Sequence, residues 1–76
     1  MQGDEFLTDL RDILQTDAAL NAASRLTALE EWDSLAQMAV MAWFDRRLGK
    51  RVDFKRIQSC ATVQELAALA GGDITV

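Results

Sequence analysis

One serine at the expected start of a helix is the clearest candidate for chemistry in this chain of 76 residues. Ser34 lies in the tripeptide Asp33-Ser34-Leu35, between an acidic stretch and an apolar helical segment. Its hydroxyl could cap the helix, because Ser34-Leu35-Ala36-Gln37 has the spacing of a capping box and would satisfy a free backbone N–H. It could instead be an attachment point for another group. The tetrapeptide alone favours the cap.

Few other residues in the chain are suited to catalysis. The sequence has no His and no Tyr, so general base catalysis near neutral pH would require a carboxylate or a lysine with a shifted pKa. Such shifts need burial, and a domain of this size offers little room for it. We therefore expect no catalytic residue and no enzymatic activity in the chain itself.

Neither the cysteine nor the acidic stretch predicts a metal site. Cys60 is the one cysteine, and its position predicts a small buried apolar side chain, because free cysteines are among the most buried residues. Glu30, Glu31 and Asp33 are close together, but they lack the glycine turn of a shaped cation-binding loop. We expect a solvated acidic stretch and no metal.

Composition and charge exclude several classes of protein. Half of the residues are apolar, which is ample for a globular core and argues against disorder. The net charge of −4 predicts poor binding to nucleic acid, because neutralising phosphates drives most of that affinity. No apolar run approaches the ~20 residues of a membrane span, and the acidic N-terminus is unlike a signal peptide. We expect a cytoplasmic monomer that binds neither nucleic acid nor membranes.

The charge is unevenly distributed along the chain. Residues 1–34 carry eight acids and two bases, whereas residues 35–76 carry four acids and six bases. The six bases form a basic cluster made of Arg46, Arg47, Lys50, Arg51, Lys55 and Arg56. Such a cluster is either a solvated face or a surface that meets an acidic patch on a partner.

Apolar spacing predicts a single all-α domain over residues 1–76, with an ordered core of about residues 4–71. We expect three longer helices and one short third helix, because no segment alternates with the period of a strand. The first helix has an apolar face formed by Phe6, Leu7, Leu10, Ile13 and Leu14. Asp4 or Gly3 can cap its start.

A long connection over residues 17–33 precedes the second helix. Three leucines are expected to pin it to the core, and these are Leu20, Leu26 and Leu29. Thr27-Ala28-Leu29-Glu30 has capping-box spacing and predicts a short turn. Connections this long in a small domain are often functional.

The second helix is predicted to begin at Asp33 or Ser34 and to end at Gly49. Its expected apolar stripe consists of Leu35, Met38, Met41, Phe44 and Leu48. Val40 and Trp43 lie off that stripe.

Two further helices are predicted after Gly49. The third is short and carries Ile57 and Cys60. The last opens with a capping box over Thr62–Glu65 and ends at Gly71-Gly72. Its inner face is expected to consist of Val63, Leu66, Ala67 and Ala70.

The order of these elements, together with one motif, resembles the acyl and peptidyl carrier proteins. The motif is Asp33-Ser34-Leu35, preceded by Glu31-Trp32 as in many stand-alone carriers. The resemblance continues through Phe44, Leu48, Val52 and the segment Ala61-Thr62-Val63-Gln64-Glu65-Leu66. It covers nearly the whole chain and implies a small four-helix bundle of acyl-carrier type.

The resemblance implies that the chain is a stand-alone carrier and a phosphoprotein. A phosphopantetheinyl transferase would attach a 4′-phosphopantetheine arm from coenzyme A to Ser34, in a metal-dependent reaction that the transferase performs. The arm's thiol would receive an acyl or aminoacyl group from a loading ligase as a thioester and present it to downstream enzymes. A phosphate on Ser34 would lie at a helix N-terminus, where free N–H groups favour an anion. Leu35 would anchor the helix start in the core, and Asp33 would cap in place of the modified serine.

The second helix departs from the fatty-acid carriers, in which its exposed face is rich in Asp and Glu. Between Leu35 and Leu48 only Asp45 is acidic. We expect partners to dock on a more apolar face that includes Ala39, Ala42, Trp43, Arg46 and Val52. Trp43 would be its anchor, since exposed Trp is favoured at binding hot spots. The alternative is that Trp43 packs against the first helix or the loop.

The cargo and the pathway are not specified by the sequence. The Met and Ala residues of the second helix fit either a flexible apolar cleft for a short acyl chain or tight packing with the cargo outside. The pathway could be fatty-acid, polyketide or nonribosomal peptide biosynthesis. A different class of protein also fits, namely an unmodified helical module that binds another protein and in which Ser34 is only a cap.

Overall fold

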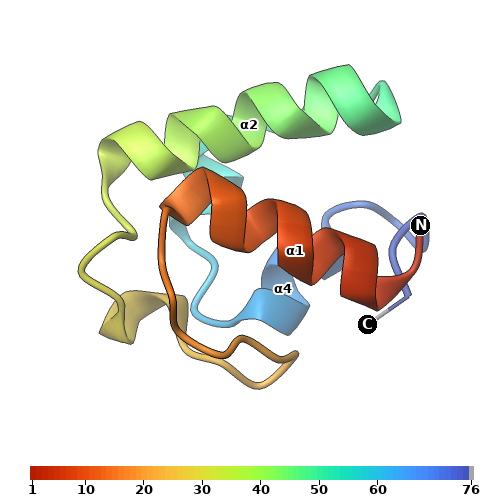
Figure 1. Cartoon of the computed structure of the whole chain (residues 1–76). Helices are drawn as coiled ribbons and strands as arrows, with labels where there is room; N and C mark the ends of the chain where they lie inside the picture. Colours follow the sequence, from red (N-terminus) through yellow and green to blue (C-terminus); the bar gives the residue numbers. More distant parts are fainter. Residues whose placement is uncertain (76) are drawn as a thin grey trace.

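A computed structural model describes residues 1–75, which form four α-helices and one short 3₁₀ helix (Figure 1). These elements are α1 (Gly3–Leu14), η1 (Leu26–Ala28), α2 (Ser34–Leu48), α3 (Phe54–Gln58) and α4 (Val63–Ala68). β pairing within residues 1–75 is limited to two isolated bridges, so the all-α prediction is confirmed. No helix in this range is long and apolar enough to cross a membrane.

The core lies between α1, α2 and the two short helices. α1 and α2 run antiparallel and side by side, α3 packs against α2, and α4 lies below α1 in the view of Figure 1. Every α-helix contributes to the core. The largest fully buried side chains are Phe6, Leu10, Leu26, Val40, Phe44, Ile57, Val63 and Leu66.

The C-terminal end of α2 and the start of α4 lie where the sequence predicts them. Gly49 ends α2 in the left-handed conformation, with φ 63°, which glycine adopts at little cost. Thr62 Oγ1 accepts a hydrogen bond from Glu65 N at 3.2 Å, which is half of the predicted capping box. α4 itself is shorter than expected, because hydrogen-bonded turns replace the helix after Ala68.

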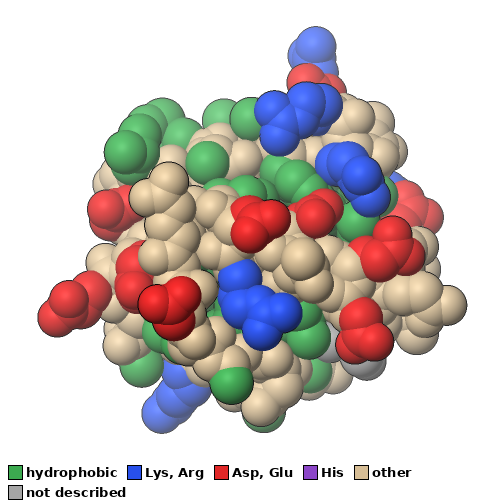
Figure 2. All heavy atoms as spheres, in the orientation of Figure 1, with side chains coloured by type: hydrophobic (Ala, Val, Ile, Leu, Met, Phe, Trp, Pro, Cys, Tyr) green, Lys and Arg blue, Asp and Glu red, His purple; other side chains and the backbone are tan. Residues whose placement is uncertain are grey.

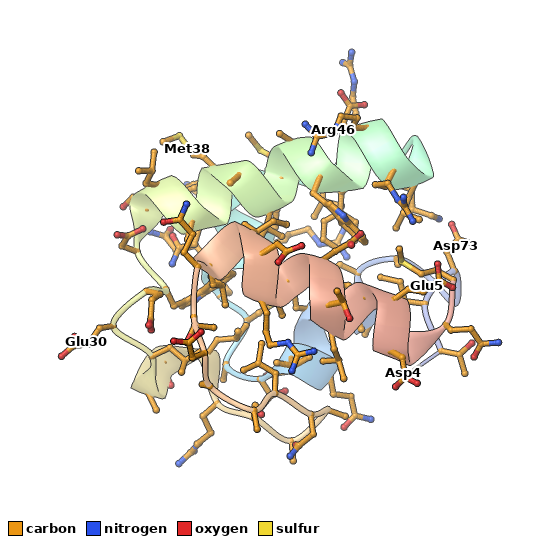
Figure 3. All side chains as sticks on the ribbon, in the orientation of Figure 1. Asp4, Glu5, Glu30, Met38, Arg46 and Asp73 are labelled. Atoms are coloured by element: carbon orange, nitrogen blue, oxygen red, sulfur yellow. The ribbon has the colours of Figure 1, made fainter. Side chains whose placement is uncertain are left out.

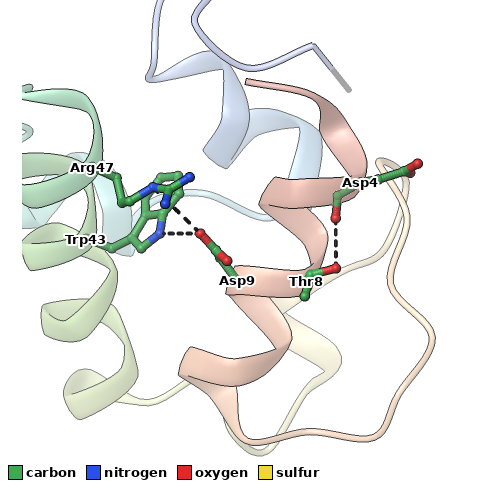
Figure 4. Close-up of polar contacts among 5 residues, drawn as sticks. All are labelled: Asp4, Thr8, Asp9, Trp43 and Arg47. Atoms are coloured by element: carbon green, nitrogen blue, oxygen red, sulfur yellow. Dashed lines mark hydrogen bonds and ion pairs between the residues drawn. The ribbon is translucent and has the colours of Figure 1, made fainter.

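The start of α1 differs from the prediction. α1 begins at Gly3, and Gln2 before it makes no side-chain cap, so the expected cap from Asp4 or Gly3 is wrong. Asp4 and Glu5 lie in the first turn instead, where their charges suit the positive end of the helix dipole. The Asp4 carbonyl oxygen accepts a hydrogen bond from Thr8 Oγ1 at 2.9 Å (Figure 4).

The rotation of α2 about its own axis also differs from the expectation. Leu35 is 73% exposed and Met38 is 47% exposed, whereas Val40 and Trp43 are buried. The expected stripe advances in steps of three residues, and each step falls about 60° short of a full turn. From Leu35 to Phe44 this drift reaches about 180°, so the two side chains face opposite sides of the helix. The side of α2 that carries Phe44 faces the core.

Trp43 is buried next to Phe44 and packs against α1. Its ring centroid lies 5.5 Å from that of Phe6 and 5.3 Å from that of Phe44. Its Nε1 donates to Asp9 Oδ2 at 3.0 Å, and Arg47 Nε lies 4.0 Å from the same oxygen (Figure 4). A Trp side chain buries more apolar area than a Leu, and its N–H has an acceptor here. Trp43 therefore packs against α1, as in the alternative stated above, and is not a surface anchor.

The long connection before α2 is tied to the start of α4. Leu26 N donates to Ala61 O at 2.8 Å, and Val63 N donates to Ser24 O at 3.0 Å. Leu20 and Leu26 are buried and Leu29 is partly buried, so the prediction that leucines pin this segment is confirmed. The short turn predicted in this segment is present as η1, but it begins at Leu26 and Thr27 does not cap it.

Both ends of the described chain pack together outside the expected core range. Ile74 is buried, and Thr75 N donates to Met1 O at 3.0 Å. Lys50 Nζ lies 3.4 Å from Asp73 Oδ2, which joins the end of α2 to the same segment. These contacts close the bundle at the end opposite Ser34 (Figure 1).

Two matched leucine substitutions test the rotation of α2. Leu66→Ala, at a position with 0% exposure, should lower the free energy of unfolding by about 2–5 kcal/mol. Leu35→Ala, at 73% exposure, should change it by less than about 0.5 kcal/mol. Urea unfolding followed by circular dichroism measures both values. A loss at Leu35 as large as that at Leu66 would mean that Leu35 is buried and that the rotation is wrong.

Candidate functional site

Asp33, and not Ser34, caps α2. Asp33 precedes the helix in an extended conformation, with φ −111° and ψ −177°, and its Oδ1 accepts a hydrogen bond from Ala36 N at 2.9 Å. Ser34 is the first helical residue. The capping role predicted for Ser34 is therefore wrong, because the cap must come from the residue before the first turn. A carboxylate in that position also suits the positive end of the helix dipole.

The cap by Asp33 leaves the Ser34 hydroxyl free. Ser34 is exposed, and no hydrogen bond joins its hydroxyl to another residue within 1–75. The backbone N–H groups of Ser34 and Leu35 likewise have no acceptor within this range. One exposed hydroxyl and two free N–H groups therefore lie together at the start of α2.

Trp32 holds the chain on the approach to Ser34. Trp32 is 9% exposed, and its backbone N–H donates to Leu29 O at 3.2 Å. On the helix side Ala36 is 8% exposed. Ser34 thus lies in a short exposed segment, residues 33–35, between the buried residues Trp32 and Ala36. The anchoring role predicted for Leu35 is wrong, since Trp32 and Ala36 provide it, and a large aromatic two residues before the serine was a signal for this.

Three of the five predicted docking residues are on the surface. Ala39, Ala42 and Arg46 are exposed on α2. Trp43 and Val52 are only 3% and 6% exposed and belong to the hydrophobic core, so neither is available to a partner. The large apolar side chains exposed on α2 are therefore not the predicted ones.

Those side chains are Leu35 and Met38, which the predicted stripe had placed in the core. The outer face of α2, meaning its exposed residues on the side away from α1, consists of Leu35, Met38, Ala39, Ala42, Asp45 and Arg46. Figure 3 shows Met38 and Arg46 on this side of the helix. The 100° rotation per residue shows from the sequence that Leu35 and Phe44 cannot lie on one face, although it does not show which of the two is buried.

Among the open grooves that flank α2, one lies near its start and another near the link to α3. The smaller has a volume of about 270 Å³ and lies between the end of α1 and the start of α2, with Leu14, Asp33 and Leu35 among its lining residues. The larger has a volume of about 480 Å³ and lies between the second half of α2 and the link to α3. It is lined by Met41, Ala42, Asp45, Arg51, Val52, Asp53 and Phe54. Its three charged residues make it more polar than the apolar cleft that the sequence suggested.

Cys60 is a buried thiol, as predicted. It is 5% exposed, and its Sγ donates to Arg56 O at 3.3 Å. Burial raises the pKa of this thiol above its ordinary value, and the nearby Glu65 carboxylate acts in the same direction, while the Arg56 charge opposes them. The protonated form therefore predominates at neutral pH, and the thiolate that nucleophilic or metal chemistry needs is disfavoured.

The arrangement around Ser34 can accept a group but has nothing to activate the hydroxyl. No hydrogen bond links it to a base in the described part of the chain. A phosphate ester there would meet two free N–H groups and the positive end of α2. Residues 1–75 contain no group of three or more His, Cys, Asp or Glu that could hold a metal ion.

A family model agrees with this geometry. The model described as phosphopantetheine attachment site matches residues 4–70, which is 67 of the 76 residues. The matched range includes Ser34, the whole of α2, α3 and α4, and α1 except for Gly3. Comparison with curated proteins and comparison with solved structures give no match.

Substitutions at two adjacent residues test which of them is the cap. Asp33→Ala should lower the free energy of unfolding by about 1 kcal/mol, because Ala36 N loses its acceptor. Ser34→Ala should change it by less than about 0.5 kcal/mol, because the hydroxyl has no partner. Asp33→Asn is the control, since asparagine also caps helices and should retain stability. Urea unfolding that ranks Ser34→Ala as the more damaging change would assign the cap to Ser34.

Alkylation kinetics test the burial of Cys60. In the folded protein at mildly alkaline pH, Cys60 should react with iodoacetamide at least about tenfold more slowly than in urea, because burial raises its pKa and blocks access. Mass spectrometry over time measures both rates. Equal rates with and without urea would mean that the thiol is exposed.

Proposed function

The chain belongs to the phosphopantetheine attachment site family, and on that premise we propose that it is a carrier protein whose arm is attached to Ser34. Members of this family carry 4′-phosphopantetheine covalently. Such domains are carriers rather than catalysts, and they work with a phosphopantetheinyl transferase and with biosynthetic enzymes. The choice of Ser34, the acyl or aminoacyl cargo and the partners described below belong to the proposal.

The free hydroxyl of Ser34 is the observation that carries the proposal. Because Asp33 caps α2, a bond to Ser34 Oγ breaks no hydrogen bond of the fold within residues 1–75. The unpaired N–H groups of Ser34 and Leu35 then offer donors to a phosphate at the same position. The other two serines differ, since Ser24 Oγ accepts from Asn21 N at 2.8 Å and Ser59 Oγ donates to Lys55 O at 2.7 Å.

The rest of the chain holds this attachment point still while leaving it accessible. Trp32 and Ala36, both buried, fix the backbone on either side of Ser34. When bound, the arm supplies a thiol that holds an acyl or aminoacyl group as a thioester. Cys60, the one thiol of the chain itself, is buried and protonated, so it does not compete for that group. The loaded arm is then presented to enzymes of a biosynthetic pathway.

The geometry argues against the alternative in which Ser34 serves only as a helix cap. That role belongs to Asp33, whose carboxylate already accepts the N–H of Ala36. In an unmodified interaction module this exposed serine would bond only to solvent. A carrier uses it as the acceptor of the arm.

Intact-mass measurement tests the proposal. The purified chain is incubated with coenzyme A and each of several broad-specificity phosphopantetheinyl transferases. The wild type should gain the mass of one arm, and Ser34→Ala should gain none. Ser59→Ala is the matched control, because it removes another exposed serine and should still be modified.

The same measurement can overturn the proposal. Modification of Ser34→Ala would place the arm on another residue. A wild type that remains unmodified with every transferase would favour the interaction module. Circular dichroism of Ser34→Ala confirms that a lost modification reflects the missing hydroxyl and not a lost fold.

A further inference from the structure

The larger groove beside α2 contains three charges that the fold leaves unpaired. Asp45 and Asp53 line it together with Arg51, and all three residues are exposed. Asp53 occupies the cap position of α3, but its side chain makes no capping hydrogen bond. Within residues 1–75 the ion pairs join other residues, so no direct contact neutralises either carboxylate. Two acids and one base give the lining a net charge of −1, which favours a cation over an anion.

The remaining lining of this groove is apolar. Met41 and Phe54 are half-buried, Val52 is buried, and Ala42 adds a small exposed side chain. The volume of about 480 Å³ is enough for a small organic group. A ligand that matches this lining therefore has an apolar part and a positively charged end.

The candidate attachment point lies on the same side of α2 as this groove. Starting at Ser34, this side of the helix carries the residues four, seven and eleven positions later. These residues are Met38, Met41 and Asp45. Around the helix axis, Asp45 lies within about 20° of Ser34. Met38 is 47% exposed, and Figure 2 shows hydrophobic side chains on the surface over the first half of α2, so an apolar path leads from the serine toward the groove.

The arm is long enough to follow this path. From Ser34 to Asp45 the helix rises by about 16 Å. About fourteen bonds separate the serine oxygen from the sulfur of the arm, and since three backbone bonds of a peptide span at most about 3.6 Å, the extended arm also spans about 16 Å. A group on that sulfur therefore reaches the level of Asp45. The flexible Met38 and Met41 side chains suit contact with the methyl and methylene groups of the arm.

We propose that this groove selects the cargo, and that the cargo is an aminoacyl group whose free ammonium pairs with Asp45 and Asp53. The proposal deepens the proposed function and rests on it, because a cargo needs the arm on Ser34. The aminoacyl side chain would pack on the apolar lining of the groove. A simple acyl group would leave both carboxylates without a partner, and a cargo that ends in a carboxylate would be repelled by the net charge of the lining.

The pairing is weak enough to be reversed by an enzyme. Both carboxylates are exposed, so each ion pair contributes little by itself. Attachment of the cargo to the same chain compensates for this, because the arm holds the ammonium near the groove at a high effective concentration. An enzyme can then withdraw the cargo without breaking a strong contact, while the groove still distinguishes cargoes with an amine from cargoes without one.

Titration of a stable cargo tests the proposal without any loading enzyme. A phosphopantetheinyl transferase attaches an arm that ends in ¹³C-labelled alanine, joined through an amide in place of the thioester. NMR spectra over a range of pH give the pKa of the alanyl amine. Nearby carboxylates stabilise the ammonium form, so on the carrier this pKa should be higher by about 0.3 or more than in the same alanyl arm free in solution. The difference should shrink at high NaCl concentration, because the charges are exposed.

Neutralising the two carboxylates, with a matched control, isolates the groove. Asp45→Asn combined with Asp53→Asn takes the net charge from −4 to −2, since each change removes one negative charge, and should return the pKa of the amine close to that of the free arm. Asp12→Asn combined with Asp17→Asn makes the same change in net charge at exposed residues that do not line the groove. That control should keep most of the rise in pKa. Circular dichroism confirms that both variants are folded.

Methionine methyl signals report where the arm lies. The chain has three methionines, Met1, Met38 and Met41, so protein labelled with ¹³C at the methionine methyl groups gives three signals. The alanyl arm should shift the signals of Met38 and Met41 and leave that of Met1, which does not line the groove, unchanged. A propionyl arm has the same length but no amine, and it should shift Met41 less than the alanyl arm does.

Intact mass is measured first, so that two kinds of failure are separated. If the wild type accepts no arm, the proposed function fails and the cargo proposal fails with it. If the arm is attached but the amine has the same pKa in the Asp45/Asp53 variant and its control, or if alanyl and propionyl arms shift Met41 equally, only the cargo proposal is overturned. A malonyl arm that shifts Met41 more than the alanyl arm would assign the groove to an anionic cargo held by Arg51 and would also overturn it.

Discussion

The contact between Trp43 and α1 determines how α2 lies on the rest of the domain. The Trp43 ring packs against Phe6 while its indole N–H donates to Asp9, and a buried indole without an acceptor would be costly. This pair of requirements restricts the rotation of α2 more than the weak apolar pattern of the helix does. The surface chemistry of the domain follows from that rotation. With Trp43 and Phe44 turned inward, the side of α2 opposite Phe44 faces solvent, and it carries Leu35 in the first turn and Arg46 near the end.

A second constraint operates at the start of α2, where two adjacent polar residues have different tasks. Asp33 satisfies the N–H of Ala36 and stabilises the first turn, so the helix does not depend on the hydroxyl of Ser34. Trp32 then fixes the chain before the cap by burying its ring. The result is a serine that can be modified without loss of a structural hydrogen bond, next to N–H groups that favour a phosphate. Stability and accessibility are supplied by different residues, as the proposed attachment of an arm to Ser34 requires.

Local signals in the sequence predicted much of the fold, while features that depend on tertiary packing were missed. Gly49 ends α2 and Thr62 caps α4 because the energetics of those positions are contained within a few neighbouring residues. The rotation of α2 has no such local determinant, since Leu35 and Phe44 offer competing apolar sides and only packing against α1, distant in sequence, decides between them. The candidate site shows the same division. The Asp33-Ser34-Leu35 motif pointed to Ser34 from the sequence. Which residue caps the helix depends on where the helix begins, and because α2 begins at Ser34 and not at Leu35, the cap is Asp33 and not Ser34.

If the arm is attached where these contacts favour it, its phosphate lies against the N–H groups of Ser34 and Leu35 and leaves the α1–α2 contact unchanged. Two-dimensional amide NMR spectra of the isotopically labelled protein, recorded before and after the arm is installed, test this directly. The largest chemical-shift changes are predicted at the backbone amides of Ser34 and Leu35, with the indole N–H signal of Trp43 unmoved. Largest changes at any other residue, or a shifted Trp43 indole signal, would contradict the placement of the arm at the free start of α2.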